Sequence, residues 1–230
     1  MGSNNTRLSP RQKMINLMYI VLTAMLALNV SSDVLNGFTQ VEEGLKRTNN
    51  NVEQRNAAIL NTLEAFAKQN PDKGQRWYDK AVEVRRITDR LYRQIDTLKL
   101  SIVREADGSD GDVNNILNRD DLEAASVVML AGQNPRGKQL RTGIEAYRTY
   151  ISSLMADSVK RQSIEKTLST DPVLRKGTLG KQSWEESKFD TQPVVAAITL
   201  LTKLQNDVKF AEGEALQTCL LYTSPSPRDA

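Results

Sequence analysis

The sequence predicts an all-α fold in which a single N-terminal transmembrane helix continues into a helical bundle. Two observations predict this fold. Residues 14–30 form an apolar run without a charged side chain. The residues after this run carry apolar side chains at steps of three, four and seven, which is the spacing of amphipathic helices. No run with the two-residue period of a strand interrupts this pattern.

The apolar run, residues 14–30, is predicted to cross a membrane. At 1.5 Å per residue its length corresponds to about 26 Å of helix, near the short limit for a hydrocarbon core of about 30 Å. Ser9, Pro10 and Gln12 mark the start, because they supply a serine N-cap, a proline at the first helical position and a glutamine three residues after the cap. We therefore expect a helix from Pro10 that continues without a break to about Lys68.

Flanking charge predicts the orientation of the span. Three basic residues precede it without an acid, and Asp33 is the first charge after it. Lysine and arginine beside a span stay cytoplasmic, so residues 1–13 are predicted to be cytoplasmic. A cleaved signal peptide is the alternative, but its apolar core is normally about 7–15 residues long. The run here is longer, and residues 30–32 make a poor cleavage site, so we expect an uncleaved anchor.

Composition excludes several classes of function. The 230-residue chain has no histidine, one cysteine and a formal net charge of +3, which the three basic residues before the span account for. The usual zinc sites and histidine-based catalytic triads therefore have no ligands or bases here. The external part is close to neutral, which gives no electrostatic case for nucleic-acid binding. We expect no enzyme activity, no catalytic residue, no cofactor and no metal.

After the membrane, a heptad pattern begins at Val34, Phe38, Val41 and Leu45 and continues to Phe66. Gly37 and Gly44 lie beside this seam and would let another helix come close. The seam is predicted to pack either against a second copy of the chain or inside the same subunit. Both possibilities are open from the pattern alone.

Further helices follow in an order that predicts an antiparallel bundle. A turn at residues 70–74 precedes a helix whose charged face (Arg85, Arg86, Asp89, Arg90, Arg93) is predicted to be solvated. A short helix is expected to end at Ala131, and a longer one is expected over 140–168. An irregular segment, 171–193, carries Trp184 and Phe189, which should pack on the bundle. The last helix should place four side chains inward: Val194, Ile198, Leu201 and Val208.

The acidic loop 107–121 resembles a calcium-binding loop only in part. Read from Asp110, its sixth residue is Asn115 where such loops have glycine, and its twelfth is Asp121 where they have glutamate. The loop is therefore better explained as a polar connection that ends in a capping box formed by Asp120 and Glu123.

Periodicity stops at Gln217. Residues 218–230, TCLLYTSPSPRDA, resemble a translated adapter sequence, so this tail, which includes Cys219, is expected to be non-native.

Two stretches resemble the GldM/PorM family of gliding-motility and type IX secretion motor proteins of Bacteroidetes. The first is residues 8–30, LSPRQKMINLMYIVLTAMLALNV, and the second is residues 184–208, with WEE at its start and LQNDV at its end. The resemblance covers about residues 7–217. It implies a homodimer in the bacterial inner membrane, with residues 31–217 as a periplasmic all-helical domain.

The resemblance also implies partners and a function. The single membrane helix would sit inside a ring of a GldL/PorL-like membrane protein and couple proton-motive force to motion of a periplasmic shaft. Further periplasmic and outer-membrane secretion components would be reached through C-terminal domains that this sequence lacks. In the membrane we expect Arg11, Asn16 and Tyr19 to contact the partner. The alternative function is a helical periplasmic sensor domain of a chemoreceptor-like signalling protein.

Overall fold

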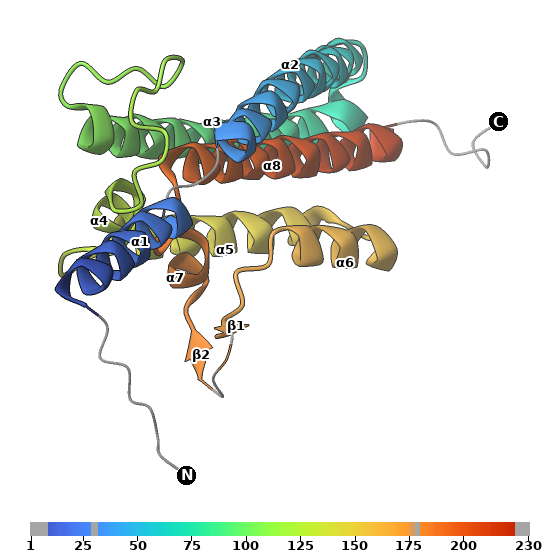
Figure 1. Ribbon diagram of the computed structural model, residues 1–230. Helices are drawn as coiled ribbons and strands as arrows, with labels where there is room; N and C mark the ends of the chain where they lie inside the picture. Colours follow the sequence, from blue (N-terminus) through green and yellow to red (C-terminus); the bar gives the residue numbers. More distant parts are fainter. Residues whose placement is uncertain (1–8, 29–31, 176, 178–179, 224–230) are drawn as a thin grey trace.

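The computed structural model describes residues 9–28, 32–175, 177 and 180–223, without the side chains of residues 25–28, and it is built almost entirely of helices (Figure 1). In chain order the elements are α1 (Pro10–Leu28), α2 (Ser32–Gln69), α3 (Pro71–Asp107), α4 (Ala124–Leu130), α5 (Arg136–Leu154), α6 (Ser158–Thr167), β1 (Val173–Leu174), β2 (Lys181–Gln182), α7 (Trp184–Phe189) and α8 (Val194–Thr223). The predicted all-helical class of the bundle is confirmed.

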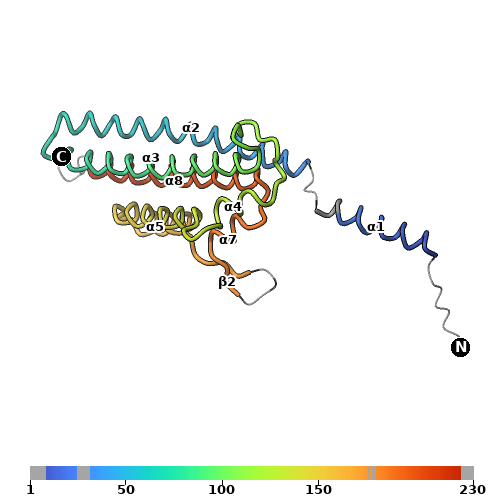
Figure 2. Tube along the Cα trace, turned by 90° about the vertical axis from the view of Figure 1, so that its left-hand side faces the viewer, coloured from blue at the N-terminus to red at the C-terminus, as the bar shows by residue number. Residues whose placement is uncertain are grey.

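Three long helices, α2, α3 and α8, lie side by side along the bundle (Figure 2). Only Asn70 separates α2 from α3, because Pro71 ends the first helix and opens the second. This confirms the predicted antiparallel hairpin. The helix α8 runs parallel to α2: Thr199 Oγ1 donates to the Phe38 carbonyl near the start of both helices, and Asn56 Nδ2 donates to the Lys209 carbonyl further along.

The core lies between α3, α5 and α8. The residues predicted to face inward from α8, Val194, Ile198, Leu201 and Val208, are all fully buried. A second layer, α5 and α6, covers the opposite side of α8 from α2 (Figure 1). Near the end of the bundle where α2 begins, α7 places Trp184 and Phe189 against the core as predicted, with ring centroids 6.0 Å apart in an edge-to-face arrangement.

The helix expected over 140–168 is in fact two helices. The first, α5, ends at Leu154, and α6 starts again at Ser158. Asp157 causes the break, because its Oδ1 accepts hydrogen bonds from the backbone N–H groups of Val159 and Lys160 and so caps a new helix.

Two other sequence-based expectations, the cap of the short helix and the irregular segment 171–193, were also wrong in part. The short helix α4 starts only at Ala124, and the carboxylate that binds its first N–H groups is Asp121 rather than Asp120. The segment 171–193 contains a small hairpin in which Val173 pairs with Gln182.

The last helix, α8, does not stop at Gln217 but continues to Thr223, because Cys219 is fully buried and the ring of Tyr222 stacks on Trp77 at 4.5 Å. Residues 224–230 of the predicted non-native tail lie outside the described residues.

The N-terminal helix, α1, begins where the sequence predicts, and the Gln12 N–H donates to Ser9 Oγ at 3.2 Å. Among the described residues, no helix has both the length and the apolar character needed to cross a membrane. The last two residues of the predicted span, Asn29 and Val30, lie outside the described part of the chain. The same holds for the junction 29–31 and hence for the predicted continuity of α1 with α2.

The close contact of α2 and α3 at their shared turn predicts a stability difference between two glycines. A Cβ on Gly74 would lie 2.7 Å from the Ala67 Cα, whereas a Cβ on Gly37 would meet nothing within 4 Å. We expect Gly74→Ala to destabilise the fold by about 1–3 kcal/mol through overpacking. Gly37→Ala should stabilise it by about 0.5–1 kcal/mol through helix propensity. Urea unfolding followed by circular dichroism, in a mild detergent, measures both; equal effects would contradict the close contact.

Candidate functional site

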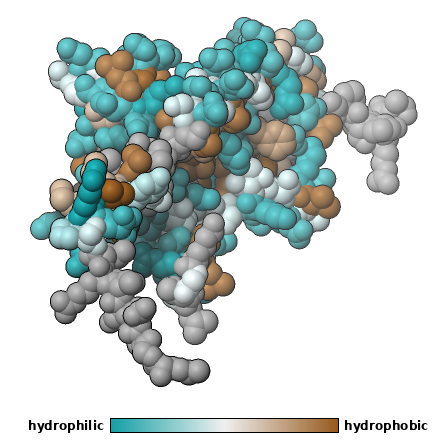
Figure 3. Space-filling view, in the orientation of Figure 1, coloured by the Kyte–Doolittle hydropathy of each residue, from teal (hydrophilic) through white to brown (hydrophobic). Residues whose placement is uncertain are grey.

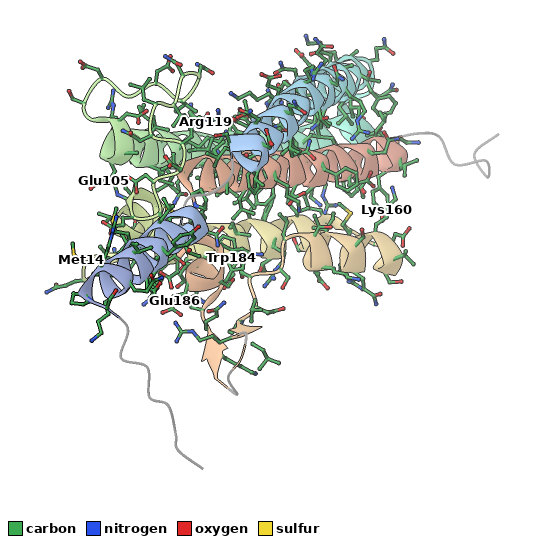
Figure 4. The ribbon with its side chains drawn as sticks, viewed as in Figure 1. Met14, Glu105, Arg119, Lys160, Trp184 and Glu186 are labelled. Atoms are coloured by element: carbon green, nitrogen blue, oxygen red, sulfur yellow. The ribbon has the colours of Figure 1, made fainter. Side chains whose placement is uncertain are left out.

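The described side chains of α1, those of residues 10–24, are all exposed. The large apolar ones among them are 43–70% exposed, with Met14 at 68%, Leu17 at 63% and Met18 at 70%. Figure 4 shows Met14 pointing outward from this helix. By contrast, mainly hydrophilic side chains cover the visible face of the bundle (Figure 3). An uncovered apolar helix on a polar bundle is typical of a segment that another molecule or a lipid phase surrounds.

The three residues predicted to bind a membrane partner all lie on α1 and are exposed. Asn16 and Tyr19 are three residues apart and so share a face of the helix. Arg11 lies about two turns before Tyr19, about 12 Å along the axis at 1.5 Å per residue. The structure therefore brings Asn16 and Tyr19 together and places Arg11 at the start of the same helix.

The predicted seam of α2 divides into two parts. Phe38 and Leu45 are half-buried, whereas Val34 and Val41 are 51% and 55% exposed. Gly37 and Gly44, beside the two valines, have no neighbouring atoms within 4 Å of where a Cβ would be. One side of the seam thus packs within the subunit, and the other side is an open stripe of small residues.

The face of α2 that packs on α8 is polar at its centre. Five of the six buried residues of α2 follow a seven-residue spacing, and three of these five are polar: Leu35, Glu42, Asn49, Asn56 and Leu63. Glu42 Oε1 accepts from Thr202 Oγ1 at 3.5 Å, and Asn56 Nδ2 donates to the Lys209 carbonyl at 2.8 Å and to Glu212 Oε2 at 3.0 Å. Hydrogen bonds of fixed geometry therefore set the register of α2 on α8.

A buried ion network joins α2, α3 and α8. Glu212 on α8 is fully buried, and it lies 3.3 Å from Arg85 Nη1 of α3 and 3.3 Å from Lys209 Nζ of its own helix. Lys209 Nζ also contacts Glu53 of α2 at 2.8 Å and Asp89 of α3 at 3.3 Å. Arg85 pairs with Glu53 and Asp89 as well. Two cations thus hold three carboxylates, one of which has no access to water.

The carboxylates of this network differ in proton affinity. Burial raises the pKa of Glu212, although Lys209 and Arg85 oppose this effect. Burial also acts on Glu53, but the hydrogen bonds from Arg85 and Lys209 outweigh it and lower the pKa of Glu53. The ionised form of Glu212 therefore depends on both cations remaining in place. Any shift of α2 that carried Glu53 away would disturb all of these contacts together.

The sequence analysis missed this network. The charged face of α3 was predicted to be solvated, and that was wrong for Arg85 and Asp89, which contact buried groups. The signal that could have found it is the repeat of polar residues at positions 42, 49 and 56, which have the spacing of a core seam. A polar residue at every seventh position of a packed helix indicates buried partners rather than solvent.

In the acidic loop 107–121, the carboxylate of Asp107 binds backbone N–H groups of the loop itself. The two carboxylate oxygens of Asp107 accept hydrogen bonds from the N–H groups of Leu117 and Asn118, each at 2.8 Å. Within the described ranges, no group of three or more metal-ligating side chains is close enough to hold an ion.

Removal of one cation tests the network. We expect Lys209→Met to destabilise the fold by about 3–5 kcal/mol, because it leaves buried carboxylates short of a partner. Adding Glu212→Gln should restore a large part of that loss, since the neutral amide needs no cation. Lys68→Met, which breaks the exposed pair with Glu64, should leave stability unchanged. Denaturant unfolding of the wild type, Lys209→Met, Glu212→Gln, the double variant and Lys68→Met measures this coupling, and additive effects of Lys209→Met and Glu212→Gln would contradict it.

Comparison with known proteins assigns the bundle to a family. The family model described as the GldM N-terminal domain matches residues 33–221, which spans α2 to α8 and most of the chain. No curated protein matches the chain significantly. Because the model covers far more than half of the sequence, the chain belongs to the GldM family, and the bundle is its N-terminal domain.

Proposed function

We infer that this chain functions broadly in gliding motility and type IX secretion, because it belongs to the GldM family; family membership gives no support to a chemoreceptor-like sensor. We propose that the chain is the inner-membrane motor component of this machinery, with its N-terminus cytoplasmic and its bundle periplasmic. In this proposal, α1 lies within a ring of a GldL/PorL-like membrane protein. Proton flow through the ring moves α1, and α2 carries that movement into the periplasm.

The observation that carries this proposal is the contrast between α1 and the bundle. The described large apolar side chains of α1 are exposed, whereas α2 is joined to its bundle by buried ion pairs and hydrogen bonds. A rotation or tilt of α1 that reaches α2 would therefore move α2, α3 and α8 as one unit.

Arg11 is the residue that we expect to couple the two proteins. Arg11 lies in the first turn of α1. In this proposal that turn is where a short span meets the cytoplasmic interface, and a guanidinium is costly there unless it reaches the headgroups or an acid. An acidic side chain of the ring is a suitable partner. Protonation of that acid would weaken the pair and free the helix to shift. Asn16 and Tyr19 would supply polar contacts deeper in the ring.

We also propose that two copies associate through the open stripe of α2. Val34, Gly37, Val41 and Gly44 form this stripe, and its small residues would let two parallel helices approach closely. The two valines would then be covered. Contacts with further periplasmic and outer-membrane secretion components would be made by other domains of such a protein.

Substitution of Arg11 tests the coupling. We expect Arg11→Ala to abolish type IX secretion and gliding, because the pair with the ring is lost. Arg11→Lys should retain the charge that sets topology but lose the planar bidentate donor, and so should reduce function strongly. Secretion of a reporter and colony spreading are the measurements.

A labelling control separates loss of coupling from failed insertion. Gln40 is exposed on α2, so a cysteine introduced by Gln40→Cys should react with an impermeant thiol reagent in spheroplasts whether or not Arg11 is replaced. The native Cys219 is buried and should add no labelling of its own. If secretion survives Arg11→Ala while labelling is normal, Arg11 only marks topology.

Disulfide cross-linking tests the dimer. Val41→Cys should form a covalent dimer in membranes under mild oxidation, because the two stripes face each other. Glu43→Cys is exposed on another side of the same helix turn and should not. Equal cross-linking at both positions would show random collision rather than a defined interface. These bands are measured on non-reducing gels in a Cys219→Ala background.

A further inference from the structure

A cavity of about 580 Å³ lies between α2, α3, α8 and the loop that follows α3. Its volume falls within the range of about 300–1,000 Å³ that is usual for small-molecule sites. The polar side chains that line it and carry the argument are Asn49, Tyr92, Asp96, Lys99 and Gln205. Leu100 and Val113 add apolar surface. This cavity lies beside the ion network around Glu212, because Tyr92 lines it and Lys209 Nζ lies 5.4 Å from the centre of the Tyr92 ring. No step of the proposed motor coupling uses the cavity.

Lys99 is a buried amine with spare hydrogen-bonding capacity. It is 5% exposed, and its Nζ donates to Gln205 Oε1 at 2.6 Å. Gln205 is held in turn by Asp96 Oδ1, which accepts from Gln205 Nε2 at 2.7 Å. No carboxylate of the described residues forms an ion pair with Lys99, although an ammonium has three donors. Burial lowers the pKa of Lys99 to about 8, against the attraction of Asp96.

Asn49 supplies the complementary group. It is 4% exposed, its Nδ2 donates to the Thr202 carbonyl at 3.5 Å, and its Oδ1 has no hydrogen-bond partner among the described residues. The partners of Asn49 and Lys99 on α8, Thr202 and Gln205, are three residues apart, about 4.5 Å along the axis. A donor of positive charge and an unpaired acceptor therefore line the same cavity, and their partners on α8 lie within one helical turn of each other.

We propose that this cavity binds a small carboxylic acid that carries a hydrogen-bond donor on the carbon next to the carboxylate, as an amino acid does. The carboxylate receives the free donors of Lys99, and the amino or hydroxyl group donates to Asn49 Oδ1. The rest of the ligand lies against Leu100 and Val113. Asp96 and Lys46 at the cavity give it both signs of charge, which suits a zwitterion.

Four related compounds test the chemistry without altering the protein. Isothermal titration calorimetry of the full chain in detergent would use L-leucine, 2-hydroxyisocaproate, isocaproate and isopentylamine. The first two should bind. Isocaproate lacks the donor for Asn49 and should bind about 3–10-fold more weakly than the tighter of them. Isopentylamine lacks the carboxylate and should bind at least about 10-fold more weakly.

Two variants and a control locate the site. Lys99→Met should abolish the preference for L-leucine over isopentylamine, which lacks the carboxylate. Asn49→Leu should abolish the preference for L-leucine and 2-hydroxyisocaproate over isocaproate. Lys73→Met makes the same change at an exposed position of α3 and should leave binding unchanged. The proposal is overturned if no compound binds at millimolar concentration, if isopentylamine or isocaproate binds as tightly as L-leucine, or if Lys99→Met retains the carboxylate preference.

Discussion

Burial of the Glu212 carboxylate among three helices is the constraint on which the bundle depends. A carboxylate without access to water requires cations at fixed positions. Lys209 and Arg85 supply these cations, and their ion pairs with Glu53 and Asp89 keep them in place. Apolar packing tolerates small sliding of one helix over another, but such a network does not. The register of α2 and α3 on α8 is therefore determined by this network and by the hydrogen bonds of Asn56, in addition to apolar packing.

Much of the bundle could be predicted from the sequence because its helices follow simple spacing. Residues such as Ile95 and Ile198 are buried where periodicity places them. Asn70 and Pro71 end one helix and begin the next, which local chemistry alone determines. The family was also predictable: the motif at residues 184–208 lies within the family model's match to residues 33–221, whereas the motif at residues 8–30 lies outside that match.

The features that the sequence analysis missed are local helix caps and contacts between distant segments. Asp157 and Asp121 each begin a helix because the side chain binds nearby N–H groups, and around Asp121 several other acidic residues could have done so. The helix continues beyond Gln217 because the ring of Tyr222 stacks on that of Trp77, which lies more than a hundred residues earlier in the sequence. The cavity beside Lys99 needs three helices and a loop at once, so no local pattern reveals it.

The parallel arrangement of α2 and α8 has a geometric consequence for leverage. Because α8 has 30 residues and runs in the direction of α2, its end lies about 45 Å along the bundle from its start. A small tilt imposed where α2 begins is thus enlarged at the far pole: five degrees over this length displaces the tip by roughly 4 Å. The three joined helices act as a lever arm whose stiffness comes from buried charge.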